Sequence, residues 1–113
     1  MNTKELFFRA RERCPMEQSE FLGYLGDCVR ALLARYPTAL LARAGDGEIS
    51  APETLEDDCG LDPLYDGALM AGAIAGKTGT AEDKSAFLTE AEHAYRACWR
   101  RAAKGKRMAR GRW

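Results

Sequence analysis

The sequence has one histidine and no Cys-x-x-Cys pair, so it lacks the usual ligand spacing of a zinc site. Its four cysteines, Cys14, Cys28, Cys59 and Cys98, are scattered, and His93 is not at ligand spacing from any of them. We therefore expect no metal or cofactor. The cysteines are expected to be small buried hydrophobic residues, and His93 a solvated helix residue.

Long apolar runs are also absent. The most apolar stretches, residues 31–42 and 68–76, are well short of the roughly 20 residues that a membrane-spanning helix needs. The first 14 residues lack the apolar centre and cleavage site of a signal peptide. We expect no membrane partner and synthesis in the cytoplasm.

Residues 76–78 read Gly-Lys-Thr, as at the end of a phosphate-binding P-loop, but the rest of that motif is missing. The glycine that should precede Gly76 by five residues is Ala71. The segment also closes an amphipathic pattern, whereas a P-loop opens a helix after a buried strand. It is better explained as a helix end and turn with Lys77 near the negative end of the helix dipole, and no nucleotide is expected.

Recognisable catalytic patterns are missing too. No Ser or Cys stands in a nucleophile motif that His93 could serve. Glu56, Asp57 and Asp58 could act as acid and base or bind a cation, but calcium-loop spacing is absent and a solvated loop is favoured. We therefore expect that the protein is not an enzyme.

What is present favours one helical domain. In 113 residues, 46% are hydrophobic, with many alanines, and 30% are charged. Capping residues, prolines and apolar spacing predict four helices. The first covers residues 3–13 after Asn2, and the second has Pro15 in its first turn and apolar spacing from residue 17 to about residue 36. The third runs from Asp62-Pro63 to about Gly76, and the fourth from Thr80 to about Gly105. The third and fourth should form an antiparallel hairpin.

The fourth helix should pack through one apolar face. Its members are Phe87, Leu88, Ala91, Tyr95, Cys98, Trp99 and Ala102. Between the second and third helices, residues 38–61 are irregular; two short strands around a turn at residues 45–47 are one possibility, and a helical extension at residues 39–42 is another. The predicted domain covers residues 1–105, followed by a flexible basic tail, residues 106–113.

The net charge is zero, yet the two signs are separated along the chain. Residues 44–66 hold eight acidic residues and no Lys or Arg, and residues 93–113 hold eight basic residues and no acid. We interpret both clusters as partner-binding. The acidic candidates are Asp46, Glu48, Glu53, Glu56, Asp57 and Asp58. The basic candidates are Arg96, Arg100, Arg101, Lys104, Arg107, Arg110 and Arg112.

The order of these segments resembles a known family. A long early helix, an acidic excursion, "LYDGALMAGAIAG" opened by Pro63, and a last helix with Ala91, Tyr95 and Trp99 are similar to the small helical head-to-tail connector proteins of tailed bacteriophages and prophages. The likeness covers residues 21–101. It implies a virion component without catalytic residues that assembles in the bacterial cytoplasm as a ring beneath the portal.

Two functions therefore remain open. The first is a non-enzymatic connector whose copies associate with each other and with a portal through complementary charge and apolar contacts. The second is a small DNA-binding protein, because a basic stripe near Trp99 and Trp113 suits phosphates and bases. The basic cluster could instead pair with the acidic loop of the same or a neighbouring subunit.

Overall fold

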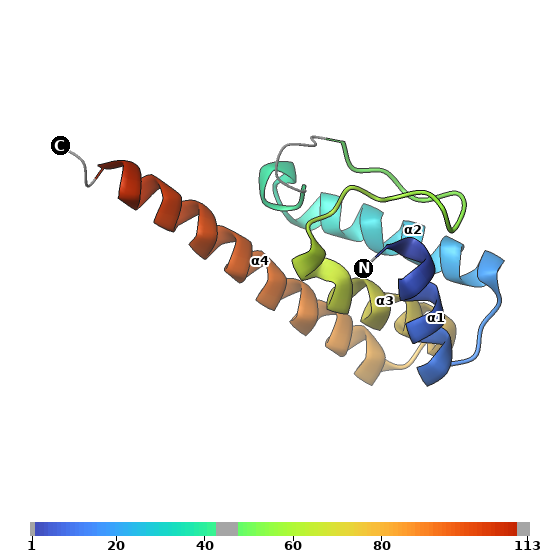
Figure 1. The fold of residues 1–113 in the computed structure, drawn as a ribbon. Helices are drawn as coiled ribbons and strands as arrows, with labels where there is room; N and C mark the ends of the chain where they lie inside the picture. The colour runs from blue at the N-terminus through green and yellow to red at the C-terminus, as the bar shows by residue number, and fades with distance from the viewer. Residues whose placement is uncertain (1, 43–47, 111–113) are drawn as a thin grey trace.

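The computed structural model describes residues 2–42 and 48–110, with the backbone alone for 104–110. It contains four α-helices and two short 3-10 turns (Figure 1). The helices are α1 (Thr3–Arg13), α2 (Gln18–Arg35), α3 (Asp66–Thr78) and α4 (Ala81–Arg110), and the turns are η1 (Thr38–Leu40) and η2 (Pro63–Tyr65). The predicted all-α class is confirmed.

Local capping explains where the first two helices begin. The Asn2 side chain accepts a hydrogen bond from the Glu5 amide at 2.8 Å, as the sequence predicted. The start of α2 was placed too early, because Pro15 precedes the helix rather than lying in its first turn. A reciprocal capping box between Glu17 and Glu20 fixes the first helical residue at Gln18.

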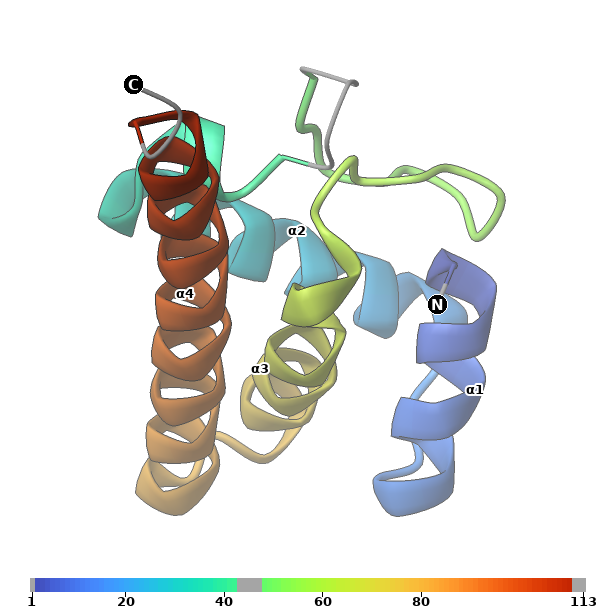
Figure 2. The same ribbon diagram turned by 60° about the vertical axis from the view of Figure 1, so that its left-hand side comes forward.

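Helix α3 lies at the centre of the molecule, with α1 and α4 on either side and α2 crossing behind it (Figure 2). Gly72 of α3 allows α2 and α4 to pack close to α3. A Cβ at this position would overlap Cys28 Sγ of α2 and lie 2.8 Å from Phe87 Cδ1 of α4. Because all three helices meet at one glycine, the core is built around α3.

The predicted α3–α4 hairpin is present. Helix α3 runs two residues past Gly76 to Thr78, and Gly79 ends it in the left-handed conformation with φ 68°. The Thr80 hydroxyl then accepts from the Asp83 amide at 3.2 Å and donates to the Asp83 carboxylate at 2.8 Å. The Gly-Lys-Thr sequence is thus the end of a helix, and Lys77 pairs with Glu20 of α2 at 2.6 Å.

The β-hairpin considered for residues 38–61 is not seen: no strand forms in the described part of this segment, and residues 43–47, with the turn, lie outside it. One isolated antiparallel bridge joins Ala42 to Leu61, and η1 takes the place of a helical extension. A loop at residues 48–61 turns back through the Ser50 amide, which donates to the Cys59 carbonyl at 3.0 Å. Buried Leu55 holds this loop against the core.

Helix α4 does not stop at Gly105 but continues to Arg110. The neighbouring Ala, Lys, Arg and Met residues are strong helix formers, and one glycine costs only about 1 kcal/mol. The last turns of α4 extend past the other helices (Figure 1), which gives a long molecule of 55 × 29 × 23 Å. The flexible tail at the end of the chain stays a prediction. Residues 111–113 lie outside the described range.

Candidate interaction surface

The acidic loop, residues 48–61, presents most of the predicted acidic side chains to solvent. The exposed ones are Glu48, Glu53, Glu56, Asp57 and Asp58. Asp46 lies outside the described residues. The loop therefore gathers the predicted acidic residues on one segment that borders α1.

Two of these aspartates also shape the loop. The Asp57 carboxylate accepts hydrogen bonds from the Glu53 and Thr54 amides at 3.1 and 3.0 Å, and Asp58 accepts from the Gly60 amide at 2.9 Å. The Asp57 carbonyl accepts from the hydroxyl of Thr3 at 2.5 Å, which ties the loop to the start of α1. Glu48, Glu53 and Glu56 are left as the charges best placed for a partner.

The basic candidates all lie on, or just beyond, the second half of α4. Arg96, Arg100 and Arg101 are exposed. Lys104, Arg107 and Arg110 belong to the projecting end of the helix, where only the backbone is described, and Arg112 lies outside the described residues. Helical spacing puts positions 96, 100, 104 and 107 along one side.

One basic residue meets one acidic residue within the chain. Asp62 is only 5% exposed; its Oδ2 accepts from Arg101 Nη2 at 2.5 Å and its Oδ1 from the Leu64 amide at 3.0 Å. The hydrogen bond to Asp62 raises the pKa of Arg101. Arg101, predicted to bind a partner, thus joins α4 to the segment that opens α3.

A second cluster, which the sequence did not reveal, joins the end of α2 to residues of α4 that lie about one and a half to two and a half turns before Arg101. The Tyr36 hydroxyl donates to Glu92 Oε2 at 2.9 Å, and Arg96 Nε donates to Glu92 Oε1 at 3.1 Å. The rings of Tyr36 and Tyr95 stack at 4.5 Å. The bonds from Tyr36 and Arg96 lower the pKa of Glu92. Tyr36 and Glu92 are 56 residues apart, so helical periodicity could not pair them.

The predicted apolar face of α4 is only partly buried. Ala91 and Cys98 are buried, whereas Leu88 is 43% and Trp99 55% exposed. Helix α3 covers one narrow stripe of α4, and these two side chains lie beside that stripe. Arg100, next to Trp99, forms no ion pair with the described residues.

An apolar groove of about 290 Å³ runs between α2 and α4. We call it the α2–α4 groove. It is lined by Ala31, Leu32, Ala34, Arg35, Phe87, Leu88 and Ala91. Small alanines on α2 leave this space open, and Leu88 forms its outer wall.

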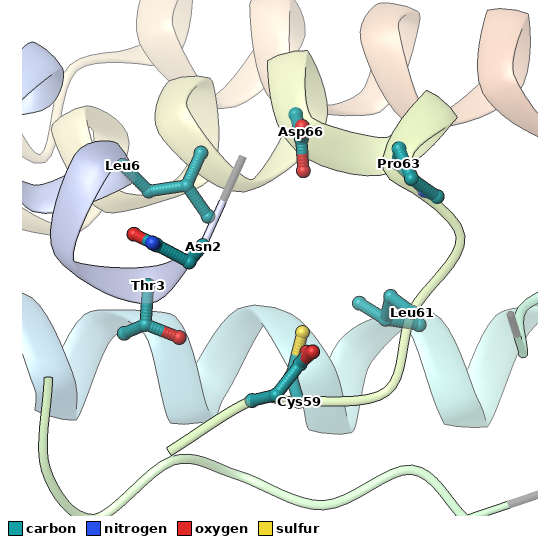
Figure 3. Close-up of a pocket in the computed structure, with 8 residues that line it drawn as sticks. Asn2, Thr3, Leu6, Cys59, Leu61, Pro63 and Asp66 are labelled. Atoms are coloured by element: carbon teal, nitrogen blue, oxygen red, sulfur yellow. The ribbon is translucent and has the colours of Figure 1, made fainter. Parts of the chain in front are cut away.

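A second hollow, of about 220 Å³, lies between the start of α1, the acidic loop and the start of α3 (Figure 3). Its lining includes Asn2, Thr3, Cys59, Leu61 and Asp66. Asn2 caps α1 and Thr3 bonds the loop, so both side chains serve the fold. Figure 3 shows Leu6 and Leu61 closing two sides of this hollow.

His93 and three of the four cysteines occupy the environments that the sequence predicted, whereas Cys14 is only partly buried. His93 is exposed, no cysteine is in a disulfide, and Cys28, Cys59 and Cys98 are buried. Burial raises the pKa of the Cys28 thiol to about 12, which keeps it protonated at neutral pH. Within residues 2–42 and 48–110, no three His, Cys, Asp or Glu residues are grouped as metal ligands.

No protein-family model, curated protein or solved structure matches this chain. None of the described helices is both long and apolar enough to cross a membrane.

Proposed function

We propose that this chain is a non-enzymatic structural protein of the phage head-tail connector type, whose copies assemble into a ring on a portal. In this proposal the basic end of α4 contacts the acidic loop of the neighbouring subunit. The observation that carries the proposal is the projection of α4 beyond the other helices, together with the exposure of Trp99 and Arg100 on the same helix.

Charge and shape both support a contact between copies. Glu53 and Glu56 are exposed on a loop held by buried Leu55, while Arg100 is exposed on a rigid helix. Opposite charges on rigid supports steer association and fix its register. Two unlike surfaces on one chain form a heterologous contact, which closes into a ring when the rotation between subunits permits.

The experiment is a charge-reversal series followed by native mass spectrometry and electron microscopy. Arg100→Glu with Lys104→Glu should abolish higher-order assembly of the purified chain. Mixing that variant with chains carrying Glu53→Lys and Glu56→Lys should restore mixed oligomers, because the reversed charges attract again.

Two exposed basic residues of α1 provide the matched control. Lys4→Glu with Arg9→Glu changes the net charge equally but leaves α4 intact, and assembly should persist. Assembly that withstands the Arg100 and Lys104 reversals would contradict the proposal. Arg101 is left out of the series because its loss would also disturb Asp62.

DNA binding is the second candidate, favoured by Arg96 and Arg100 lying near the exposed Trp99 on a projecting helix. Phosphate contacts by such residues give affinity that falls steeply with salt, and an aromatic side chain can stack on bases. The test is binding to a fluorescent duplex at low and near-physiological salt, compared with a chain truncated after Gly105. Binding that survives physiological salt and is lost on truncation would favour this function over the ring.

A further inference from the structure

The α2–α4 groove and Trp99 lie on the same side of α4. Leu88, the outer wall of the groove, and Trp99 are separated by about three helical turns, so they point in nearly the same direction. Trp99 is 55% exposed, the highest value among the large hydrophobic residues described. One face thus carries both an apolar projection and an apolar recess.

The charges of α4 are also divided between its two halves. Residues 81–92 contain four acidic residues and one lysine, whereas residues 93–110 contain seven basic residues and no acid. In an antiparallel pair of such helices, the acidic half of each lies beside the basic half of the other. A parallel pair would place like charges together.

We propose that two copies of this chain pair through α4 in antiparallel orientation, with Trp99 of each copy inserted in the α2–α4 groove of the other. A two-fold contact requires that position i meets position j and that j meets i. The 88–99 pairing meets this requirement, since both positions belong to one face. The groove, at about 290 Å³, suits one aromatic side chain better than a larger ligand.

The pairing would place the two-fold axis midway between Leu88 and Trp99, beside Tyr36, Glu92 and Tyr95. These side chains already hold one another through the 2.9 Å hydrogen bond and the ring stack, so they offer a rigid centre. The dimer does not rest on the proposed ring. It uses Trp99 and the surroundings of Arg100, so it would compete with any other partner of the same end of α4.

Sedimentation velocity on the full chain over a wide concentration range tests the pairing. The wild type should reach a dimer and not grow further through this contact. Trp99→Ala removes the projection and Leu88→Lys puts a charge at the groove, so each should weaken the dimer by about tenfold or more. Phe8→Ala is the matched control, because Phe8 is also 43% exposed but lies on α1, and it should leave the dimer unchanged.

A mixture of the two weakened variants identifies the two-fold pairing. The Leu88→Lys chain keeps its Trp99 and the Trp99→Ala chain keeps its groove, so the mixture should form heterodimers at concentrations where each variant alone is monomeric. In a Trp113→Phe chain, Trp99 is the one remaining tryptophan, and its emission should shift to the blue on dimerisation.

Circular dichroism and thermal melting should show both variants folded, since Leu88 and Trp99 are exposed. A wild type that stays monomeric, a dimer that resists both substitutions, or a mixture without heterodimers would overturn the pairing. Because the ring is tested through Arg100, Lys104 and the acidic loop, failure of either proposal can be recognised without reference to the other.

Discussion

Arg101 of α4 and Asp62, the residue before η2, are joined by a hydrogen bond of 2.5 Å between Arg101 Nη2 and Asp62 Oδ2. The acidic and basic segments of the chain therefore meet inside one subunit at this point. The Asp62 side chain is only 6% exposed, whereas that of Arg101 is 60% exposed. The pair thus connects a buried acceptor to a solvated donor.

Replacing Arg101 with Gln should lower the free energy of unfolding by about 1–2 kcal/mol, because Asp62 loses a charged hydrogen-bond partner. The lower part of the range for charged hydrogen bonds applies, since water screens the exposed guanidinium. Urea unfolding measures the effect. Arg100→Gln, one residue away and without a partner among the described residues, should change stability little; equal losses would contradict the role of the Asp62 contact.

Replacing Gly72 with Ala should destabilise the protein by about 1–3 kcal/mol, because the added methyl overlaps Cys28 and Phe87. Gly23→Ala is the control: a Cβ there has no atom within 4 Å, and the higher helix propensity of Ala should stabilise α2 by about 0.5–1 kcal/mol. Thermal melting compares the two. If both substitutions move the melting temperature in the same direction, the close packing at Gly72 does not determine the effect of an added methyl group there.

Replacing Thr80 with Ala should cost about 0.5–2 kcal/mol, because the Asp83 amide loses its hydroxyl acceptor at the start of α4. Thr89→Ala tests the same chemical change in the middle of the helix, where Ala has the higher propensity and should be neutral or stabilising. Denaturant unfolding of both variants separates the loss of the capping hydrogen bond from the general effect of replacing Thr with Ala. An unaffected Thr80→Ala protein would show that the cap contributes little.

Acid should remove the stabilisation that Glu92 provides. The hydroxyl of Tyr36 and the guanidinium of Arg96 lower the folded-state pKa of Glu92 below the ordinary value of a glutamate side chain. The contribution is therefore complete above the unfolded-state pKa and is lost as the pH falls through the folded-state pKa. Glu92→Gln should be less stable than wild type at pH 7, and the difference should shrink in acid.

Urea unfolding at pH 7 and at about pH 3, below the usual range of a glutamate pKa, measures this convergence. Glu90→Gln is the control, because no pairing partner of Glu90 is found in the described part of the chain and its loss should have little effect at either pH. A stability difference for Glu92→Gln that is the same at both pH values would contradict the ionic role.

The sequence by itself determined the helical class and most helix ends, because these depend on signals that act over a few residues. Asn2 caps α1, Gly79 ends α3 and Thr80 caps α4, each through a bond or conformation within one turn. Three ends differ from the prediction: α2 begins after Pro15, α3 runs past Gly76 to Thr78, and α4 continues past Gly105. In α4 the helix propensity of the residues around Gly105 outweighs the cost of one glycine, so the helix continues to Arg110.

Only the tertiary structure decided which side chains of α4 face solvent. Periodicity grouped Leu88 and Trp99 with Ala91 and Cys98, but the width of the buried stripe depends on how α3 packs. Likewise, the Arg101–Asp62 pair joins residues 39 apart and the Tyr36–Glu92 pair residues 56 apart. Such contacts follow from the relative placement of whole helices, which capping and periodicity do not specify.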